Sequence, residues 1–396
     1  MTPRTVVIVG AGLAGSRCAE TLRAEGFDGR IVLVGDEALP PYERPALSKE
    51  YLAGERERIE LRPRQVWRER DIELVLGQRV DRLDLANRTY AGGPPADALV
   101  ISTGARARML PGPVPEGVLT LRTAADADRL RSELTGAPLT QQRAGAGRRD
   151  PARCLAIVGA GFVGAEVAST ARQLGVDVTL IDLTPAPLSR VLGEAAGEVL
   201  ARRYRSHGVE LRMGVGLSRI LTSSEGRVKG LELADGSVVG CDVALIAIGA
   251  EPASELLGGD RAGIETDACG RTALAGVFAC GDVASAWRPS LGAHVRVEHW
   301  TSAAGQAAAV AHAILGRTRP YDDLPYFWSD QFGLRLQHVG HPHGWETTEV
   351  EGDESSFCVR FLDAQHRLLG ALVANRPRDI GALRREVLAS AQAVAA

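Results

Sequence analysis

The chain has 396 residues, more than one compact core of ordinary size holds, so we expect two or three domains. A hydrophobic fraction of 45%, a charged fraction of 24% and a formal net charge of -3 describe an ordinary globular protein and give no support for nucleic-acid binding. The longest apolar runs fall far short of the ~20 residues that span a bilayer, and no signal peptide is evident, so we expect a cytoplasmic protein without a membrane span.

Apolar runs rich in Val and Ile alternate with Ala-rich helical patterns along the chain, which is typical of parallel sheets with crossover helices. The fold class is therefore α/β. A glycine-rich segment occurs twice, as VVIVGAGLAG at residues 6–15 and as AIVGAGFVG at residues 156–164. This repeat predicts two Rossmann-like dinucleotide-binding domains.

The first glycine segment combines Gly10, Gly12 and Gly15 with an acidic residue, Asp36, about 20 positions later. The first glycine permits a tight turn, the second lets the backbone approach a pyrophosphate, and the third lets helix and strand pack closely. The free N–H groups of the following helix stabilise phosphate charge, and the acidic side chain accepts hydrogen bonds from ribose hydroxyls. Two glycine turns that bind nothing would need this whole combination to arise by coincidence twice.

Between the two glycine segments, residues 98–104 read ALVISTG and predict an apolar strand that ends at Thr103 and Gly104. Residues 136–153 are rich in Gly, Pro and Arg and lack any periodicity, so we expect a solvated loop.

The second glycine segment has Gly159, Gly161 and Gly164, followed by Asp182. A carboxylate beside the ribose repels a 2'-phosphate, and residues 183–187 offer no Lys or Arg to neutralise one. We therefore expect NADH to be preferred over NADPH. We also assign two further residues to this NAD site, Val163 and Gly249.

Residues 276–282, GVFACGD, predict a strand that ends in Gly281 and Asp282. This ending resembles the Gly-Asp motif of flavoproteins with two dinucleotide sites, in which the Asp binds the ribityl chain of FAD; a helix cap is the alternative role. A helix is expected over residues 299–315, with its N-terminus toward the flavin. The FAD-binding domain is then discontinuous, at residues 1–110 and 241–318, with the NAD-binding domain at residues 111–240.

From about Pro320 onward the chain changes to alternating, more aromatic segments such as FCVRFL at residues 357–362. These segments predict antiparallel strands of a smaller α+β C-terminal domain at residues 319–396. His338, His341 and His343 raise the alternative of a metal site, but no carboxylate or cysteine completes it at suitable spacing. We favour a polar hairpin turn there and predict no metal.

Four motifs carry a resemblance to a known family: PYERPALSKEYL at residues 41–52, GAGFVGAEVA at 159–168, FACGDV at 278–283 and YFWSDQ at 326–331. Together they resemble the NADH-dependent ferredoxin reductases of oxygenase systems, among them putidaredoxin reductase and the reductases of aromatic-ring dioxygenases. The resemblance covers nearly the whole chain and implies a glutathione-reductase-like architecture. It also implies an oxidoreductase, specifically a ferredoxin–NAD(+) reductase that carries FAD.

The resemblance implies roles for individual residues. Arg44 and Lys49 would lie over FAD, and Glu166 and Trp328 would lie near the nicotinamide. The residues implied to contact the flavin nucleotide are Ala14, Val80, Arg122 and Trp300. From residue type alone, Lys49 could instead be a surface lysine and Trp328 a core aromatic. The chain departs from the family at Asp182, where Glu is common, and at Ala186, where Arg is common.

The implied activity transfers a hydride from NADH to FAD and then single electrons to a [2Fe-2S] ferredoxin, which serves a cytochrome P450 or a ring-hydroxylating dioxygenase. A disulfide reductase or NADH oxidase on the same scaffold needs a reactive cysteine over the flavin. Residues 42–48 contain none, Cys18 is expected to pack behind the first glycine turn, and the six cysteines are scattered. A further alternative is an NADH-sensing protein of the apoptosis-inducing-factor type.

Overall fold

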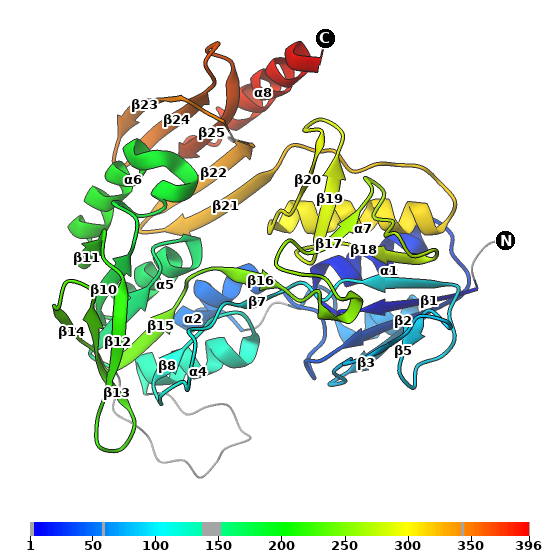
Figure 1. Ribbon diagram of the computed structural model, residues 1–396, viewed down its shortest axis with the longest axis horizontal. Coiled ribbons are helices and arrows are strands. Elements are labelled where there is room, and N and C mark those ends of the chain that lie inside the picture. The colour runs from blue at the N-terminus through cyan, green and yellow to red at the C-terminus, as the bar shows by residue number, and fades with distance from the viewer. Residues whose placement is uncertain (1–3, 58–59, 137–151, 342–343, 396) are drawn as a thin grey trace.

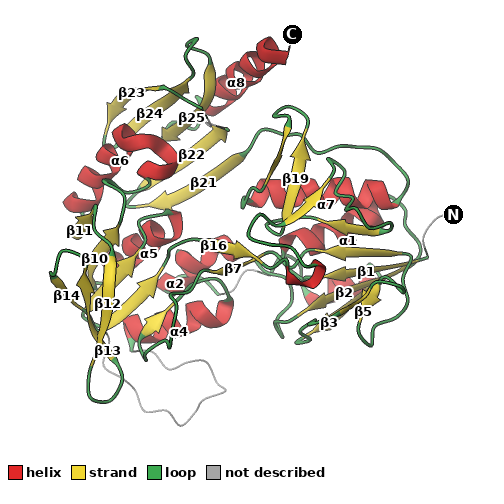
Figure 2. Ribbon diagram, in the orientation of Figure 1, coloured by secondary structure: helices red, strands yellow, loops and turns green. Residues whose placement is uncertain are grey.

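The computed structural model describes residues 4–57, 60–136, 152–341 and 344–395 (Figure 1). Two parallel sheets lie side by side in the view, and an antiparallel sheet with the C-terminal helix lies above the second of them (Figures 1 and 2). Most of the loop expected at residues 136–153 falls outside the described residues, as does His343.

The first sheet has five parallel strands in the order β18-β6-β1-β2-β3. Val6 and Ile8 belong to a different hydrophobic cluster from Val7 and Val9, because successive side chains of a strand point to opposite faces. Both faces are covered, which explains the continuous apolar runs. The strands are β1 (Thr5–Val9), β2 (Arg30–Gly35), β3 (Ile72–Leu76), β6 (Ala98–Ile101) and β18 (Val277–Ala279).

Helices α1 (Leu13–Ala24) and α7 (Trp300–Ile314) pack against one another on one face of this sheet. The helix expected over residues 299–315 is therefore confirmed as α7. Smaller elements of this half are α3 (Arg64–Glu69), β4 (Leu83–Asp84), β5 (Thr89–Tyr90), η3 (Glu255–Leu257), β17 (Ile264–Thr266), β19 (Ala284–Arg288) and β20 (Ala293–Val295). Two further elements, η1 (Arg44–Ser48) and α2 (Glu50–Ala53), follow β2 in the chain but pack against the second half, whose core Leu52 joins.

The second sheet repeats the plan, with five parallel strands in the order β11-β10-β9-β15-β8. Helices α5 (Phe162–Gln173) and α6 (Ser189–Ser206) share a core with one face. The strands are β8 (Val118–Leu119), β9 (Cys154–Val158), β10 (Asp177–Asp182), β11 (Val209–Met213) and β15 (Val243–Ile246); β12 (Leu217–Thr222), β13 (Val228–Leu233) and β14 (Val238–Gly240) form a small antiparallel sheet, and α4 (Ala124–Thr135) precedes β9. Two Rossmann-like units are thus present.

The chain passes between the two halves twice, through the antiparallel pair β7 (Ala105–Ala107) and β16 (Ala250–Pro252). The predicted boundary at residue 241 assigns β15 to the FAD-binding domain, yet β15 pairs with β9 and β8 in the second sheet. That boundary is therefore too early, because an apolar strand does not reveal which sheet it joins. We propose that the NAD-binding domain ends after β15 and that the FAD-binding domain resumes at β16.

The C-terminal sheet is antiparallel, with the order β21-β22-β25-β24-β23. One face packs against α8 (Ile380–Ala395), and the other joins the core of α5 and α6. The strands are β21 (Tyr326–Gln331), β22 (Leu334–Gly340), β23 (Thr347–Asp353), β24 (Ser356–Leu362) and β25 (Leu368–Ala374). This confirms a smaller α+β unit at the C-terminal end. None of the helices in the described ranges is long and apolar enough to cross a membrane.

Candidate active site

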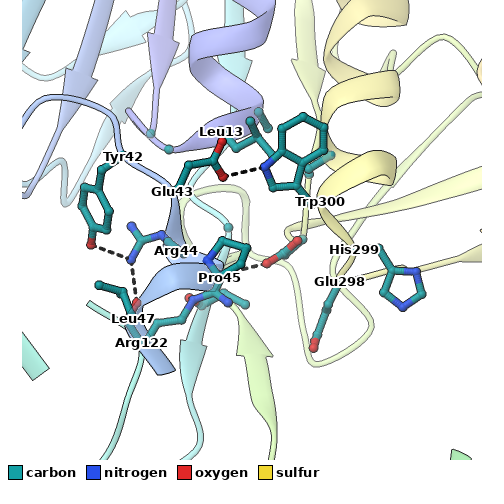
Figure 3. Close-up of a pocket in the computed structure, with 18 of the residues that line it drawn as sticks. Leu13, Tyr42, Glu43, Arg44, Pro45, Leu47, Arg122, Glu298, His299 and Trp300 are labelled. Carbon is teal, nitrogen blue, oxygen red and sulfur yellow. Dashed lines mark hydrogen bonds and ion pairs between the residues drawn. The ribbon is translucent and has the colours of Figure 1, made fainter. Parts of the chain in front are cut away.

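A cavity of about 340 Å³ lies where the carboxyl end of the first sheet meets α5 and β21 (Figure 3). Its walls come from segments far apart in the chain: the β1–α1 turn, η1, the end of β6, the start of α7, the first turns of α5 and strand β21. Crevices at the carboxyl ends of parallel strands are the usual ligand sites of such sheets.

The first glycine turn is built to leave the N-terminus of α1 open toward this cavity. Gly10 has φ +114°, and a Cβ there would lie 2.1 Å from the Ser102 carbonyl oxygen. Gly15 packs so closely that a Cβ would lie 2.0 Å from the Gly10 oxygen, whereas a Cβ at Gly12 would meet nothing within 4 Å. The open position at Gly12 lets a ligand approach the free N–H groups of the helix.

The second glycine turn has the same geometry. Gly159 has φ +113°, a Cβ at Gly164 would lie 2.0 Å from the Gly159 oxygen, and Gly161 is open. The Asp182 carboxylate accepts hydrogen bonds from the backbone N–H of Ala160 at 2.6 Å and of Thr184 at 2.8 Å. These contacts fix a negative charge beside the turn. Gly249, at φ +103° with open space around it, lies between β15 and β16.

Arg44 joins several parts of the cavity wall. Its guanidinium donates to the Arg122 carbonyl at 2.8 Å and to the Tyr42 hydroxyl at 3.2 Å (Figure 3). It also donates to Glu37 Oε1 at 2.7 Å. Burial raises the pKa of Tyr42, so the phenol stays protonated and donates to Glu37 at 2.7 Å. Through these contacts, Arg44 links the segment of Glu37 and Tyr42 to the segment of Arg122.

Arg122 and Asp282 form an ion pair of 2.6 Å between Arg122 Nη2 and Asp282 Oδ2. Arg122 also donates from Nε to the Ala105 carbonyl at 2.9 Å. Asp282 follows Gly281, whose N–H donates to Gln306 Oε1 of α7 at 3.0 Å. The carboxylate is therefore held at the cavity by side chains and is not a simple helix cap, since no helix begins at this position.

Glu166, on the second turn of α5, is only 6% exposed and is the centre of a buried polar cluster. Its Oε2 accepts from Lys49 Nζ at 2.7 Å and from the Ser48 hydroxyl, and its Oε1 accepts from the Ser329 hydroxyl at 2.7 Å. Lys49 also donates to the Pro45 carbonyl at 2.8 Å. With a side chain 13% exposed, Lys49 is not a surface lysine.

Two tryptophans form an aromatic wall. The Trp300 indole N–H donates to Glu43 Oε2 at 2.8 Å (Figure 3). The Trp300 and Trp328 ring centroids are 6.3 Å apart. Trp328 lies on the half-exposed face of β21, where residues alternate between half-buried and buried. It therefore lines the cavity and is not a core aromatic of the C-terminal sheet.

A stack of rings continues from this wall into the protein. His299 lies 4.8 Å from the Phe327 ring centroid, and Phe327 is stacked on His338 at 4.8 Å. Burial lowers the pKa of His299 to about 4 and that of His338 to about 3. Neither ring nitrogen of His338 has a hydrogen-bond partner. No group of three His, Cys, Asp or Glu side chains suited to a metal is found within the described ranges.

The structure brings most of the predicted residues together. Those that line the cavity are Gly10, Gly12, Ala14, Asp36, Arg44, Lys49, Thr103, Gly104, Arg122, Val163, Glu166, Gly281, Asp282, Trp300 and Trp328. Gly15 packs behind the first turn, and the second turn, Asp182 and Gly249 lie outside the cavity lining. Val80 packs against the core of the first sheet and is not among the lining residues, so its flavin contact stays a prediction.

Sequence reasoning missed several polar residues of the site: Glu37, Tyr42, Glu43, Ser48, Gln306 and Ser329. A signal existed for Ser329, because Ser329 and Gln331 occupy the buried positions of β21, where a polar residue requires a partner. For the others, only the folded chain reveals the partner.

Thiol chemistry has no support at this cavity, since the part of the chain that the structure describes puts no cysteine in its lining. Cys18 and Cys280 are buried, and burial raises the pKa of both thiols, that of Cys280 to about 12. A thiolate is the reactive form, so these side chains are inert at neutral pH.

Comparisons with known proteins agree with this geometry. Residues 4–307 match the family model described as pyridine nucleotide-disulphide oxidoreductase, and residues 326–396 match the reductase C-terminal domain. The ferredoxin–NAD(+) reductase component of the anthranilate 1,2-dioxygenase system of Burkholderia cepacia is 39% identical, over 99% of this chain and 96% of that protein. The corresponding component of the p-cumate 2,3-dioxygenase system of Pseudomonas putida is 37% identical, over 96% and 92%.

Solved structures extend the comparison. Putidaredoxin reductase in its covalent complex with putidaredoxin has a TM-score of 0.88 at 30% identity, over 97% of this chain and 93% of that one. The ferredoxin reductase for the CYP199A2 system of Rhodopseudomonas palustris has a TM-score of 0.88 at 32% identity, over 96% and 93%. With its two nucleotide-binding turns, its shared cavity and its reductase C-terminal domain, the chain belongs to the pyridine nucleotide-disulphide oxidoreductase family.

Proposed function

We propose that the protein is an FAD-dependent NADH:ferredoxin oxidoreductase, which passes electrons from NADH to a [2Fe-2S] ferredoxin. The observation that carries the proposal is the buried Lys49–Glu166 pair, which lies at one cavity between the two nucleotide-binding halves. The printed names of the relatives support ferredoxin as the acceptor. They include both dioxygenase and CYP systems, so a cytochrome P450 or a ring-hydroxylating dioxygenase is the proposed final recipient. We also propose a cytoplasmic location.

The residues around the cavity fit FAD. The open position at Gly12 exposes the N-terminus of α1 to a pyrophosphate, and Asp36 offers a carboxylate for ribose hydroxyls at the end of β2. Asp282, held by Arg122, would bind the ribityl chain. Bound FAD supplies the capacity to accept a hydride and to release electrons singly.

Lys49 is the one cation in this buried cluster, and its charge favours an anion on the neighbouring cofactor. Glu166 holds the ammonium group in place through its Oε2 atom. Their burial excludes water, so the pair acts in a medium of low dielectric constant. We propose that this arrangement promotes flavin reduction, without any proton transfer that the chain must perform.

For NADH, we propose the second glycine turn together with Asp182, Gly249, Val163 and Trp328. Val163 lies at the start of α5 and is 42% exposed, so a nucleotide on the second turn can reach it. Its neighbours on α5 and β21 line the cavity that we propose for the flavin, which supports a nicotinamide position there. Asp182 is already fixed by two backbone N–H groups and repels a 2'-phosphate.

The test is a comparison of electron acceptors. The holoenzyme is reduced with NADH and mixed with [2Fe-2S] ferredoxins, with oxygen or with a disulfide such as oxidised glutathione, and reoxidation is followed by flavin absorbance. We expect at least one ferredoxin to be reduced faster than either competitor. If no ferredoxin exceeds oxygen at low and at high salt, the proposal fails, and a protein that senses NADH becomes the better account.

A further inference from the structure

A chain of hydrogen bonds extends from Glu166 away from the cavity, through β21 to α6. The Ser329 hydroxyl donates to Glu166 Oε1 at 2.7 Å and accepts from Gln331 Nε2 at 3.0 Å. The Gln331 carbonyl oxygen in turn accepts from the Tyr204 hydroxyl. Three separate elements therefore contribute to one polar chain.

The hydrogen bonds of this chain run in one direction, from the Tyr204 hydroxyl to the Glu166 carboxylate, which can only accept. A serine hydroxyl carries a single proton, and Ser329 gives it to Glu166 while its oxygen accepts from the Gln331 N–H group. If the Gln331 amide turned over, its oxygen would compete for the Ser329 proton, and Tyr204 would lose its acceptor. The Tyr204 hydroxyl donates to the Gln331 oxygen and so stabilises the amide orientation in which the N–H group faces Ser329.

Burial makes this order costly to break. Tyr204 and Ser329 are 0% exposed, and Gln331 is 2% exposed. A buried polar group that loses its partner cannot turn to bulk water, and the loss is felt by its neighbours in the chain. The elements are also fixed to each other, because the Phe332 N–H donates to Ser169 Oγ of α5 at 2.7 Å.

We propose that Tyr204 and Gln331 are positioning residues for the reaction with NADH, and that they act through Ser329 to hold the Glu166 carboxylate in the orientation that pairs with Lys49. This inference rests on the proposed function, because it concerns the step in which NADH reduces the bound flavin. It assigns to Tyr204 and Gln331, which do not line the cavity, control over the charge inside it.

Three isosteric or nearly isosteric variants test the chain: Ser329→Ala, Gln331→Met and Tyr204→Phe. For each holoenzyme, rapid mixing gives the limiting rate of flavin reduction and the dissociation constant of NADH, and a dye-referenced titration without NADH gives the flavin midpoint potential. We expect the limiting rate to fall about tenfold in Ser329→Ala and about three- to tenfold in the other two, with NADH affinity unchanged. The potential should move in the same direction in all three.

The double variant Tyr204→Phe/Ser329→Ala separates positioning from general destabilisation. If Tyr204 acts through Ser329, the double variant reacts at the rate of Ser329→Ala alone, whereas independent structural effects multiply. Tyr321→Phe is the matched control, since Tyr321 is also buried but lies outside this chain, and it should match the wild type. Should Tyr204→Phe lose FAD, Gln331→Met with Ser329→Ala provides the same comparison.

Multiplicative rates in the double variants, or wild-type rate and potential in both Tyr204→Phe and Gln331→Met, would overturn the inference. Its failure is distinguishable from failure of the proposed function. A wild-type protein that NADH reduces but that reduces no ferredoxin contradicts only the function. If NADH does not reduce the wild type at all, the midpoint potentials still test the chain.

Discussion

Arg122 and Asp282 are 160 positions apart in the sequence, yet their side chains meet at 2.6 Å on the wall of the cavity. Arg122 precedes α4 and Asp282 follows β18, so the pair ties the chain leaving the first sheet to the chain returning to it. The carboxylate that we assign to the ribityl chain is thus oriented by a residue from the start of the inserted segment.

We predict that Arg122→Ala weakens FAD retention about tenfold, because Asp282 loses the donor that orients it. Asp282→Ala should weaken it at least as much. The measurement is FAD release on dilution, followed by flavin fluorescence. Glu73→Ala is the control, since it removes an exposed ion pair with Arg30 in the same sheet and should leave FAD bound. Unchanged retention in both Arg122→Ala and Asp282→Ala would refute the assignment.

Asp182→Ala should narrow the preference for NADH over NADPH. The variant removes the charge that repels a 2'-phosphate. Because residues 183–187 contain no Lys or Arg to bind that phosphate, the preference should narrow but not reverse. Steady-state kcat/KM for both nucleotides measures the effect, and Asp177→Ala, at the opposite end of β10, is the control. Equal kcat/KM for the two nucleotides in the wild type would mean that Asp182 does not lie at the ribose.

Lys49→Met should slow flavin reduction about 10- to 100-fold, because the positive charge beside the cofactor is lost. It should also lower the melting temperature, because Glu166 is left as a buried charge without its cation. The double variant Lys49→Met/Glu166→Gln removes that unpaired charge. We expect the double variant to regain stability while flavin reduction stays slow; recovery of the rate would show that the Lys49 charge has no direct role.

His338 should make the folded state sensitive to acid. Its folded pKa of about 3 lies below the unfolded value of about 6.5, so the unfolded chain binds more protons between these values. Stability is therefore complete above about pH 6.5 and is lost as the pH falls toward 3, by about 2 kcal/mol at pH 5 if His338 acts alone. The neighbouring His299 and His341 lower the pKa of His338 further, whereas Asp282 raises the pKa of His299.

The check is the drop in melting temperature between about pH 7.5 and pH 5. His338→Phe should show a smaller drop than the wild type, because a phenyl ring keeps the stack on Phe327 and takes up no proton. His294→Asn, at an exposed histidine, should behave like the wild type. An equal drop in His338→Phe and in the wild type would exclude His338 as the source.

Local sequence patterns predicted the parts of the fold that local backbone geometry determines. The glycine turns at Gly10 and Gly159 need a positive φ and a close carbonyl, and only glycine permits both, so they stand out in the sequence. The helix after His299 was likewise predicted from a local pattern, its run of alanines.

Contacts between distant segments could not be predicted in this way. Ser329 and Glu166 are 163 positions apart, and nothing near either residue specifies the other. The membership of β15 in the second sheet has the same cause, since its four apolar residues fit any buried parallel strand. Lys49, Glu166 and Trp328 were placed at one site by family resemblance, which carries tertiary information that spacing alone lacks.

The central claim is tested most directly by counting electrons. A limiting amount of NADH is added anaerobically to the holoenzyme with excess [2Fe-2S] ferredoxin, and the bleaching of the ferredoxin is measured. A flavoprotein that takes a hydride and passes electrons singly to this acceptor reduces two ferredoxins for each NADH consumed. Oxidation of NADH without bleaching, or bleaching that does not depend on NADH, would contradict the account.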